Sequence, residues 1–389
     1  MRVRPILVAS LTTGIALAGA CSDGSAPARA AGATQGPSST SAGPASGARS
    51  TSTTRSPNTA KPTAAGPAPR TEDGNGTAVT IAFGGDVNYD GALRNRLATD
   101  PDTMLDGVRP VLAAADLTVV NLETSIGSGG ERQSKQFTFQ APPSAFDALR
   151  AAGVDVIGMA NNHAVDFGTE GLRQTLAAID SSGAPVVGIG ADDAAAFRPR
   201  VVTVRGQRIA VIAATEVIDS NLVTAWTATA THPGVASAKR VDRLVSAVND
   251  ARSRADTVVV FLHWGTEKEH CPDADQRALA PTLVDAGADV IVGGHAHRVQ
   301  GGGYLGHAFV EYGLGNFQFR ADSAEGRETG VLTVTVAGRR VDGAVWSPAQ
   351  VGADALPRLL SGTAARAAQD RWVDYRACAK LADEPTDRP

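Results

Sequence analysis

Two histidines separated by one alanine, His295 and His297, follow an apolar run and two glycines in the stretch DVIVGGHAHRVQGG (residues 289–302). The run is rich in β-branched residues, which is typical of a buried strand. The two imidazoles that follow it could bind a metal ion, act as a pH-sensitive switch, or have no joint role. If the strand continued through both residues, their side chains would point the same way, which favours metal binding.

Four other strand-like runs also end in polar side chains of types that bind metals. These runs end at Asp86, at Asn121-Leu122-Glu123, at Asn161-Asn162-His163 and at His263. In open α/β sheets, ligands bind beyond the carboxyl ends of the strands. We therefore expect all five strand ends to place these side chains at one edge of the fold.

The expected metal ligands offer oxygen and nitrogen atoms and no thiolate. They are Asp86, Glu123, Asn162, His263, His295 and His297. Mixed oxygen and nitrogen ligation suits Mn²⁺, Zn²⁺ or Fe, and six ligands are more than one tetrahedral ion needs. The set suits a centre of two divalent ions with a bridging water made nucleophilic, in which a carboxylate such as Asp86 or Glu123 also bridges. Occupancy by one ion or by two stays open.

His163 and Asp166 are the predicted catalytic residues. His163 lies next to the ligand candidate Asn162 and is free to act as an acid toward a leaving oxygen. Asp166 either orients that histidine, since histidines at such sites usually need a partner, or opens the next helix. Glu267, four residues after His263, is either a further ligand or base or part of a solvated turn.

Each motif also has a structural interpretation when it is taken alone. The GGD sequence at 84–86 is compatible with a plain turn, and the NNH sequence at 161–163 with a cap, since Asn tolerates left-handed backbone. His263 is compatible with a core histidine beside Trp264. Joint occurrence at successive strand ends, rather than any single match, predicts the metal site.

From Thr77 onward, short β-branched runs alternate with amphipathic stretches, and antiparallel hairpins follow late in the chain. Strands are predicted at 78–87, 116–123, 154–163, 184–190, 256–265, 288–295 and 307–317, hairpins at 200–217 and 330–348, and helices at 144–153, 168–183, 239–255, 275–287 and 363–380. Ser144 is expected to cap the first of these helices. This order predicts an α/β fold in which helices cover mixed sheets.

The N-terminal segment has the features of a secretory signal peptide, predicted at residues 1–20. Arg2 and Arg4 precede an apolar run that is short for a membrane-spanning helix. The run ends with small residues before Cys21 and resembles a bacterial lipobox. We therefore expect lipidation of Cys21 and a lipoprotein anchored outside the cytoplasm to the bacterial cell membrane; the alternative is an ordinary secreted protein.

The rest of the chain divides by composition. Residues 21–76 are built mainly from Ser, Thr, Ala, Gly and Pro without large apolar side chains, which predicts a disordered tether. One large domain is expected at 77–350, followed by a helical extension at 351–389. Outside the cytoplasm, Cys271 and Cys378 are expected to form a disulfide, with two free thiols as the alternative.

The charge pattern excludes one class of partner. The formal net charge is −4, and the chain has neither a run of Lys and Arg nor a basic helix. Proteins that bind nucleic acids carry such features. No nucleic-acid partner is expected.

Six motifs, in this order, resemble those of the CapA-type family of poly-γ-glutamate capsule biosynthesis, a branch of the calcineurin-like metallophosphoesterase superfamily. They are FGGDV (83–87), VVNLETSI (119–126), MANNHAVDFG (159–168), FLHWGTE (261–267), QRALAPTLVDAGADVIVGGHAHRVQG (276–301) and YGLGNFQF (312–319). The resemblance implies a four-layer α/β/β/α sandwich of two mixed sheets flanked by helices. It also implies metal binding by the six ligands named above and an acid role for His163.

The same resemblance suggests a membrane-attached role in making or exporting poly-γ-glutamate or a related envelope polymer, with a membrane synthase or exporter as partner. The chain lacks an ATP-binding P-loop motif, so it is not expected to activate glutamate itself. Two functions are carried forward. One is a metal-dependent hydrolase, and the other is a non-catalytic scaffold or polymer-binding component of an export complex.

The chain departs from the family's pattern in three places. It has GDVNYDG where the family often has GDVMLGR, it has Asn88 where superfamily phosphoesterases carry a histidine, and it has Gly294 where a further histidine often precedes the final pair. The six predicted ligands are all retained. The departures bear on whether two metal ions bind.

Overall fold

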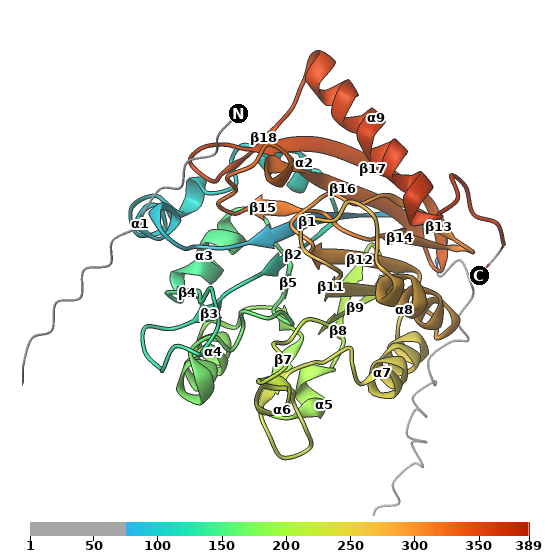
Figure 1. The fold of residues 1–389 in the computed structure, drawn as a ribbon. Helices are drawn as coiled ribbons and strands as arrows, with labels where there is room; N and C mark the ends of the chain where they lie inside the picture. The colour runs from blue at the N-terminus through green and yellow to red at the C-terminus, as the bar shows by residue number, and fades with distance from the viewer. Residues whose placement is uncertain (1–74, 388) are drawn as a thin grey trace, which may run out of the picture. The chain divides into compact units, whose positions relative to one another are not determined.

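The computed structural model describes residues 75–387 and Pro389, which Figure 1 shows in colour. The predicted signal peptide (1–20), the predicted lipidation site Cys21 and nearly all of the predicted tether lie outside the described residues. Among the helices that are described, none combines the length and the apolar character needed to cross a bilayer.

The first sheet has eight strands and mixes parallel with antiparallel pairing. In spatial order they are β18 (Pro357–Leu359), β17 (Arg340–Val351), β16 (Glu328–Ala337), β1 (Val79–Val87), β2 (Leu117–Leu122), β5 (Val156–Gly158) and β6 (Val186–Val187), with β15 (Asn316–Gln318) also paired to β1. The pairs β1–β2 and β2–β5 are parallel. Their carboxyl ends therefore meet at one edge of the sheet.

The second sheet has six strands and is also mixed. In spatial order they are β13 (Gly302–Leu305), β14 (Ala308–Glu311), β12 (Val290–His295), β11 (Thr257–Trp264), β9 (Gln207–Thr215) and β8 (Arg200–Val204). The predicted hairpin between β8 and β9 turns at Arg205 and Gly206, whose φ angles of 49° and 82° suit a two-residue hairpin loop. Strands β9, β11 and β12 run parallel.

Side chains on each central strand alternate between two cores. Along β1, Ile81 and Phe83 join a core that combines residues of both sheets, whereas Ala82 joins a core beneath helices. Along β11, Phe261 joins the core between the sheets and Val260 joins the core of the other helical layer. The strands are therefore buried on both faces, which confirms the predicted four-layer α/β/β/α sandwich.

Helices cover the outer face of each sheet, as Figure 1 shows for α3 and α4 on one side and α7 and α8 on the other. The helices before the last one are α1 (Ala92–Thr99), α2 (Arg109–Leu112), α3 (Ser144–Ala151), α4 (Gly168–Ser182), α5 (Asp193–Ala196), α6 (Val223–Trp226), α7 (Val241–Arg254) and α8 (Ala274–Asp285). Short elements complete the fold: the 3₁₀ turns η1 (Pro101–Thr103) and η2 (Glu325–Arg327), and the pairs β3 (Ser125–Ile126) with β4 (Gln140–Ala141) and β7 (Ile189–Gly190) with β10 (Gly234–Val235).

The predicted cap of α3 is wrong. Ser144 is the first helical residue, and the N-cap is Pro143, which has no side-chain hydrogen bond to the helix. By contrast, α8 begins with a capping box in which Asp273 and Gln276 exchange side-chain and backbone hydrogen bonds.

The last helix, α9 (Gly362–Ala379), packs against β17 of the first sheet and β13 of the second. Its Trp372 donates a 2.8 Å hydrogen bond from Nε1 to Glu311 Oε2. Its Cys378 is bonded to Cys271, which lies between β11 and α8. The C-terminal helix is thus fastened to both sheets and to a loop next to the end of β11.

Candidate metal centre

The first sheet brings Asp86, Glu123 and Asn162 to one edge. Asp86 lies near the end of β1, Glu123 directly follows β2, and Asn162 lies in the turn after β5. A Cβ atom at Gly85 would lie 2.1 Å from the carbonyl oxygen of Gly315. The glycine before Asp86 is therefore needed for the close approach of the segment leading into β15.

The second sheet contributes the three histidines. His263 is the residue before the end of β11, and His295 is the last residue of β12. The strand ends at His295, as the predicted bounds have it, and it does not continue through His297, because His295 and His297 have left-handed backbones with φ angles of 85° and 51°. His297 nevertheless turns toward the first sheet, with its Nδ1 atom 3.7 Å from Asp86 Oδ2.

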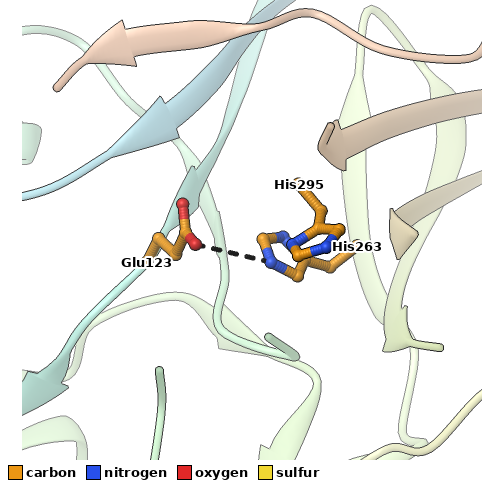
Figure 2. A group of neighbouring side chains, drawn as sticks. All are labelled: Glu123, His263 and His295. Carbon is orange, nitrogen blue, oxygen red and sulfur yellow. Dashed lines mark ion pairs between the residues drawn. The ribbon is translucent and has the colours of Figure 1, made fainter. Parts of the chain in front are cut away.

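Side chains from both sheets meet in one buried cluster. His263 Nε2 lies 2.7 Å from Asn162 Oδ1 and 3.5 Å from Glu123 Oε1. Figure 2 shows Glu123 facing the rings of His263 and His295, with the Glu123–His263 pair dashed. The structure thus brings together all six side chains that the sequence singled out as ligands.

Three groups of side chains in the described part of the chain have ligand atoms within 4.8 Å of one another. They are Glu123–His263–His295, Asp86–Glu123–His297 and Glu267–His295–His297. The first two groups share Glu123, whose carboxylate has two oxygens to offer. Asp86 also reaches two histidines, with Oδ1 3.9 Å from His263 Nδ1 and Oδ2 3.7 Å from His297 Nδ1, so the choice between the two bridging carboxylates stays open.

The donor atoms of this cluster fit a divalent cation. Neither carboxylate oxygen of Glu123 has a hydrogen-bond partner among the residues that the structure describes, and the same holds for Nδ1 of His295. Both residues are buried. Since buried carboxylates in folded proteins are normally paired or coordinate a metal, a cation held between Glu123 and the histidines would supply the partner.

Burial shifts the pKa of two carboxylates and two histidines of the cluster in the direction that favours their neutral forms. It raises the pKa of Asp86, and it raises the pKa of Glu123 well above its usual range, with the Asp86 charge adding to the second shift. It lowers the pKa of His263 well below its usual range and that of His295 to about 3. Neutral imidazole is the form that binds metals, and a cation would favour the ionised carboxylates.

His163 is held beside this cluster by Asp166. The Nδ1 atom of His163 lies 2.6 Å from Asp166 Oδ2, and its Nε2 atom lies 3.7 Å from Glu123 Oε1. The ring of Phe139 packs against that of His163 at a tilt of 37°, with centroids 4.3 Å apart. One ring nitrogen is thus fixed by the aspartate and the other faces the ligands, as an acid at this position requires.

Lys135 is a functional candidate that the sequence did not reveal. Its side chain is only 5% exposed, and its Nζ atom lies 2.9 Å from Asp166 Oδ1. The same ammonium donates to the backbone carbonyl of Asn162 and lies 3.5 Å from Asp219 Oδ2. Lys135 lies in a polar stretch between two motifs. No spacing or periodicity in the sequence indicates that it contacts the turn that contains Asn162 and Asp166.

Two asparagines support the ligands from behind. Asn121 donates from Nδ2 to Asp86 Oδ1 at 2.8 Å, and this nitrogen lies 3.1 Å from His263 Nδ1. Asn316 Oδ1 lies 2.8 Å from His297 Nδ1. Such partners orient metal-binding side chains. Asn121 stood within the predicted VVNLETSI motif and Asn316 within YGLGNFQF, although neither was singled out as a site residue.

The structure gives physical reasons for two of the departures from the family's pattern. Asn88 uses its amide on the backbone, since Oδ1 accepts from the Asp90 N–H at 2.6 Å and Nδ2 donates to the Glu123 carbonyl at 3.3 Å. A Cβ atom at Gly294 would lie 2.4 Å from Asp86 Oδ1, so a larger residue there would displace the aspartate.

Comparison with known proteins gives a consistent family assignment. The family described as "Bacterial capsule synthesis protein PGA_cap" matches residues 80–321. The "Capsule biosynthesis protein CapA" of Bacillus anthracis is 31% identical over 233 residues, covering 58% of this chain and 55% of that protein. The "PGA biosynthesis protein CapA" of Bacillus subtilis (strain 168) is 30% identical over 221 residues, covering 56% and 57%. The chain therefore spans little more than half the length of these relatives.

Among solved structures, a 5'-nucleotidase from Candida albicans SC5314 is 12% identical, with coverage of 78% of this chain and 58% of that one. The TM-score of 0.41 is too low for an argument about function.

Proposed function

Because the chain belongs to the bacterial capsule synthesis protein (PGA_cap) family, we propose that it acts in the biosynthesis of poly-γ-glutamate or a related envelope polymer. In this proposal it is a metal-dependent hydrolase that works outside the cytoplasm on material delivered by a membrane synthase or exporter. The lipobox-like sequence before Cys21 supports attachment to the membrane through a lipid.

One observation carries the catalytic part of the proposal. Glu123 is fully buried, it stands at the junction of two ligand groups, and no hydrogen-bond donor in the described structure reaches its carboxylate. The histidines beside it come from the second sheet. Divalent cations at this place would supply Lewis acidity and an activated water, and a purely structural protein has no chemical need for this set.

The chain's own residues would then have distinct roles. Asp86, Glu123, Asn162 and the three histidines would hold the cations. His163 would act as an acid in its doubly protonated form, donating Nδ1–H to Asp166 Oδ2 at 2.6 Å and carrying the transferable proton at Nε2, the nitrogen that faces the ligands. The tilted ring of Phe139 packs against this imidazole. Together these contacts direct the proton toward the leaving oxygen of a bound phosphoester or related bond.

A specific observation favours a second candidate, a non-catalytic scaffold or polymer-binding component. The amide of Asn88 is engaged with the backbone at the position where the superfamily carries a histidine. The Asp86–Glu123–His297 group therefore lacks one nitrogen ligand. Weak binding at this group would leave one cation and a less reactive site.

The metal content of the full chain tests the proposal. We expect bound transition metal after reconstitution with Mn²⁺ or Zn²⁺, and hydrolysis in a screen of phosphoester and γ-glutamyl substrates. His263→Ala should lose the metal, whereas His232→Ala, at a histidine outside the three ligand groups of the described residues, should retain it. If the wild-type chain binds no metal, the hydrolase proposal fails and the non-catalytic scaffold becomes the favoured function.

Attachment to the membrane is tested separately by fractionation of cells. We expect the wild-type chain in the membrane fraction and Cys21→Ser outside it. An unchanged distribution of the variant would reject the lipid anchor and leave the hydrolase proposal untouched.

A further inference from the structure

One exposed carboxylate outside the six predicted ligands also faces the centre. The ligand atoms of Glu267, His295 and His297 lie within 4.8 Å of one another. His295 also belongs to the group of Glu123 and His263, and His297 to the group of Asp86 and Glu123. Glu267 therefore meets one histidine from each of the two inner groups, and it does so from the solvent, since it is exposed while Glu123 is buried.

The loop that carries Glu267 is fastened to the segment that carries the two histidines. The backbone N–H of Lys268 donates to the carbonyl of Ala296, the residue between them, at 2.7 Å. Further along, His270 Nδ1 lies 2.9 Å from the carbonyl oxygen of Val299. These contacts keep the position of Glu267 fixed relative to His295 and His297.

The far end of the same loop is held covalently. Cys271 is bonded to Cys378 of α9, and the ring of His270 stacks on Tyr375 of the same helix, with centroids 4.6 Å apart. A loop held on both sides keeps its side chains near their places without a bound ligand. The place of Glu267 is therefore determined by the fold.

We propose that Glu267 is a further carboxylate ligand that closes the metal centre from its solvent side. This inference rests on the proposed function, because it requires that the buried cluster bind divalent cations. His295 has a buried Nδ1 atom that meets no hydrogen-bond partner in the part of the chain that is described, so it has a nitrogen to offer. Asp86 and Glu123 alone leave positive charge on two divalent ions, and a third carboxylate reduces it.

The added oxygen ligand has a consequence for the choice of metal. Imidazoles suit Zn²⁺, whereas carboxylate and carbonyl oxygens suit Mn²⁺. With Glu267, the centre contains three carboxylates and the amide oxygen of Asn162. Loss of Glu267 should therefore weaken binding of Mn²⁺ more than binding of Zn²⁺.

The test compares two nearly isosteric substitutions in one loop, made in the full chain. Glu267→Gln removes the proposed ligand, and Glu269→Gln is the matched control, since Glu269 is also exposed and belongs to no ligand group of residues 75–387. Mn²⁺ and Zn²⁺ affinities are measured by competition with a chromophoric chelator, and near-ultraviolet circular dichroism checks the fold. We expect Mn²⁺ binding to weaken about 10-fold or more in Glu267→Gln and to stay unchanged in Glu269→Gln.

The outcomes separate this inference from the one on which it rests. If the wild-type chain binds neither metal, both the proposed function and the role of Glu267 fail. If the wild-type chain binds Mn²⁺ and Glu267→Gln binds it equally well, only the role of Glu267 is overturned. Should Glu267→Gln misfold, Glu267→Asp serves instead, because a shortened carboxylate at this exposed position must also weaken Mn²⁺ binding if the proposal holds.

Discussion

The Nδ1 atom of His163 lies 2.6 Å from Asp166 Oδ2, which directs the other ring nitrogen toward Glu123. The second oxygen of the same carboxylate is paired with Lys135 at 2.9 Å. The orientation of the candidate acid therefore depends on a buried ion pair. Substitution of Asp166 and substitution of Lys135 are therefore expected to have different effects.

Asp166→Asn should impair turnover without loss of metal. An amide can leave the ring of His163 free to rotate or select the wrong tautomer, so we expect kcat to fall roughly 100-fold. The metal content should stay that of the wild-type chain, since Asp166 belongs to none of the ligand groups among the described residues. Asp219→Asn is the control, because Asp219 contacts the same lysine at 3.5 Å but does not touch His163.

Lys135→Met should destabilise the fold. The substitution leaves the buried carboxylate of Asp166 without its cation, and removal of one partner from a buried pair typically lowers the free energy of unfolding by about 3 kcal/mol or more. Urea denaturation measures the change. Adding Asp166→Asn to Lys135→Met should restore part of the stability; an additive loss in the double variant would show that the two side chains do not act as a pair.

The metal-free chain should lose stability as pH rises, through Glu123. Burial raises the folded-state pKa of Glu123 well above its usual range, whereas the unfolded chain releases this proton near pH 4.3. Above that pH the folded state binds more protons than the unfolded state, so the free energy of unfolding falls as the pH rises toward the folded pKa.

Glu123→Gln isolates this effect. In the presence of a chelator at pH 7, we expect the variant to be more stable than the wild-type chain by about 1–3 kcal/mol, the usual effect of an unsatisfied buried group. The difference should vanish below about pH 4. Urea denaturation at several pH values measures it, and a variant less stable than wild type at pH 7 without metal would contradict the assignment of Glu123 as uncompensated.

Metal removal should lower the melting temperature. The ligands come from both sheets, so a cation bound by the folded chain alone stabilises their packing, by about 2.7 kcal/mol at a concentration 100 times Kd. For a domain of this size, we expect a rise of about 5 °C or more on addition of Mn²⁺ or Zn²⁺. Calorimetry with and without chelator measures it, and His263→Ala should show no rise.

The sequence alone was sufficient to predict the position of those ligand candidates that lie at the ends of strands. Asp86, Glu123 and His263 could be predicted because parallel strands bring their ends to one edge, whatever the details of packing. The condition that His295 and His297 share one strand is not met, since the backbone turns at His295, and His297 reaches the cluster through that turn. The hydrophobic pattern fixes where a strand runs but not the turn that follows it.

Contacts that depend on how loops cross the sheet edge could not be predicted. Lys135 reaches Asp166 from a loop whose course is set by tertiary packing, and no local pattern encodes that course. The cap of α3 failed for a related reason: Pro143 is compatible with helical backbone angles, so the helix begins one residue earlier than the preference of Ser144 for the cap position indicates.

The buried carboxylate of Glu123 has an evolutionary consequence. A single nucleotide change converts a Glu codon into a Gln codon, and in a lineage that used this fold only as a scaffold the change would improve the protein without harm. Mutation would therefore erase Glu123 from such lineages. If Glu123 binds a cation as proposed, the residue at this position would serve as a genetic marker: Glu would be expected in relatives selected for cation binding, and an amide in relatives released from it.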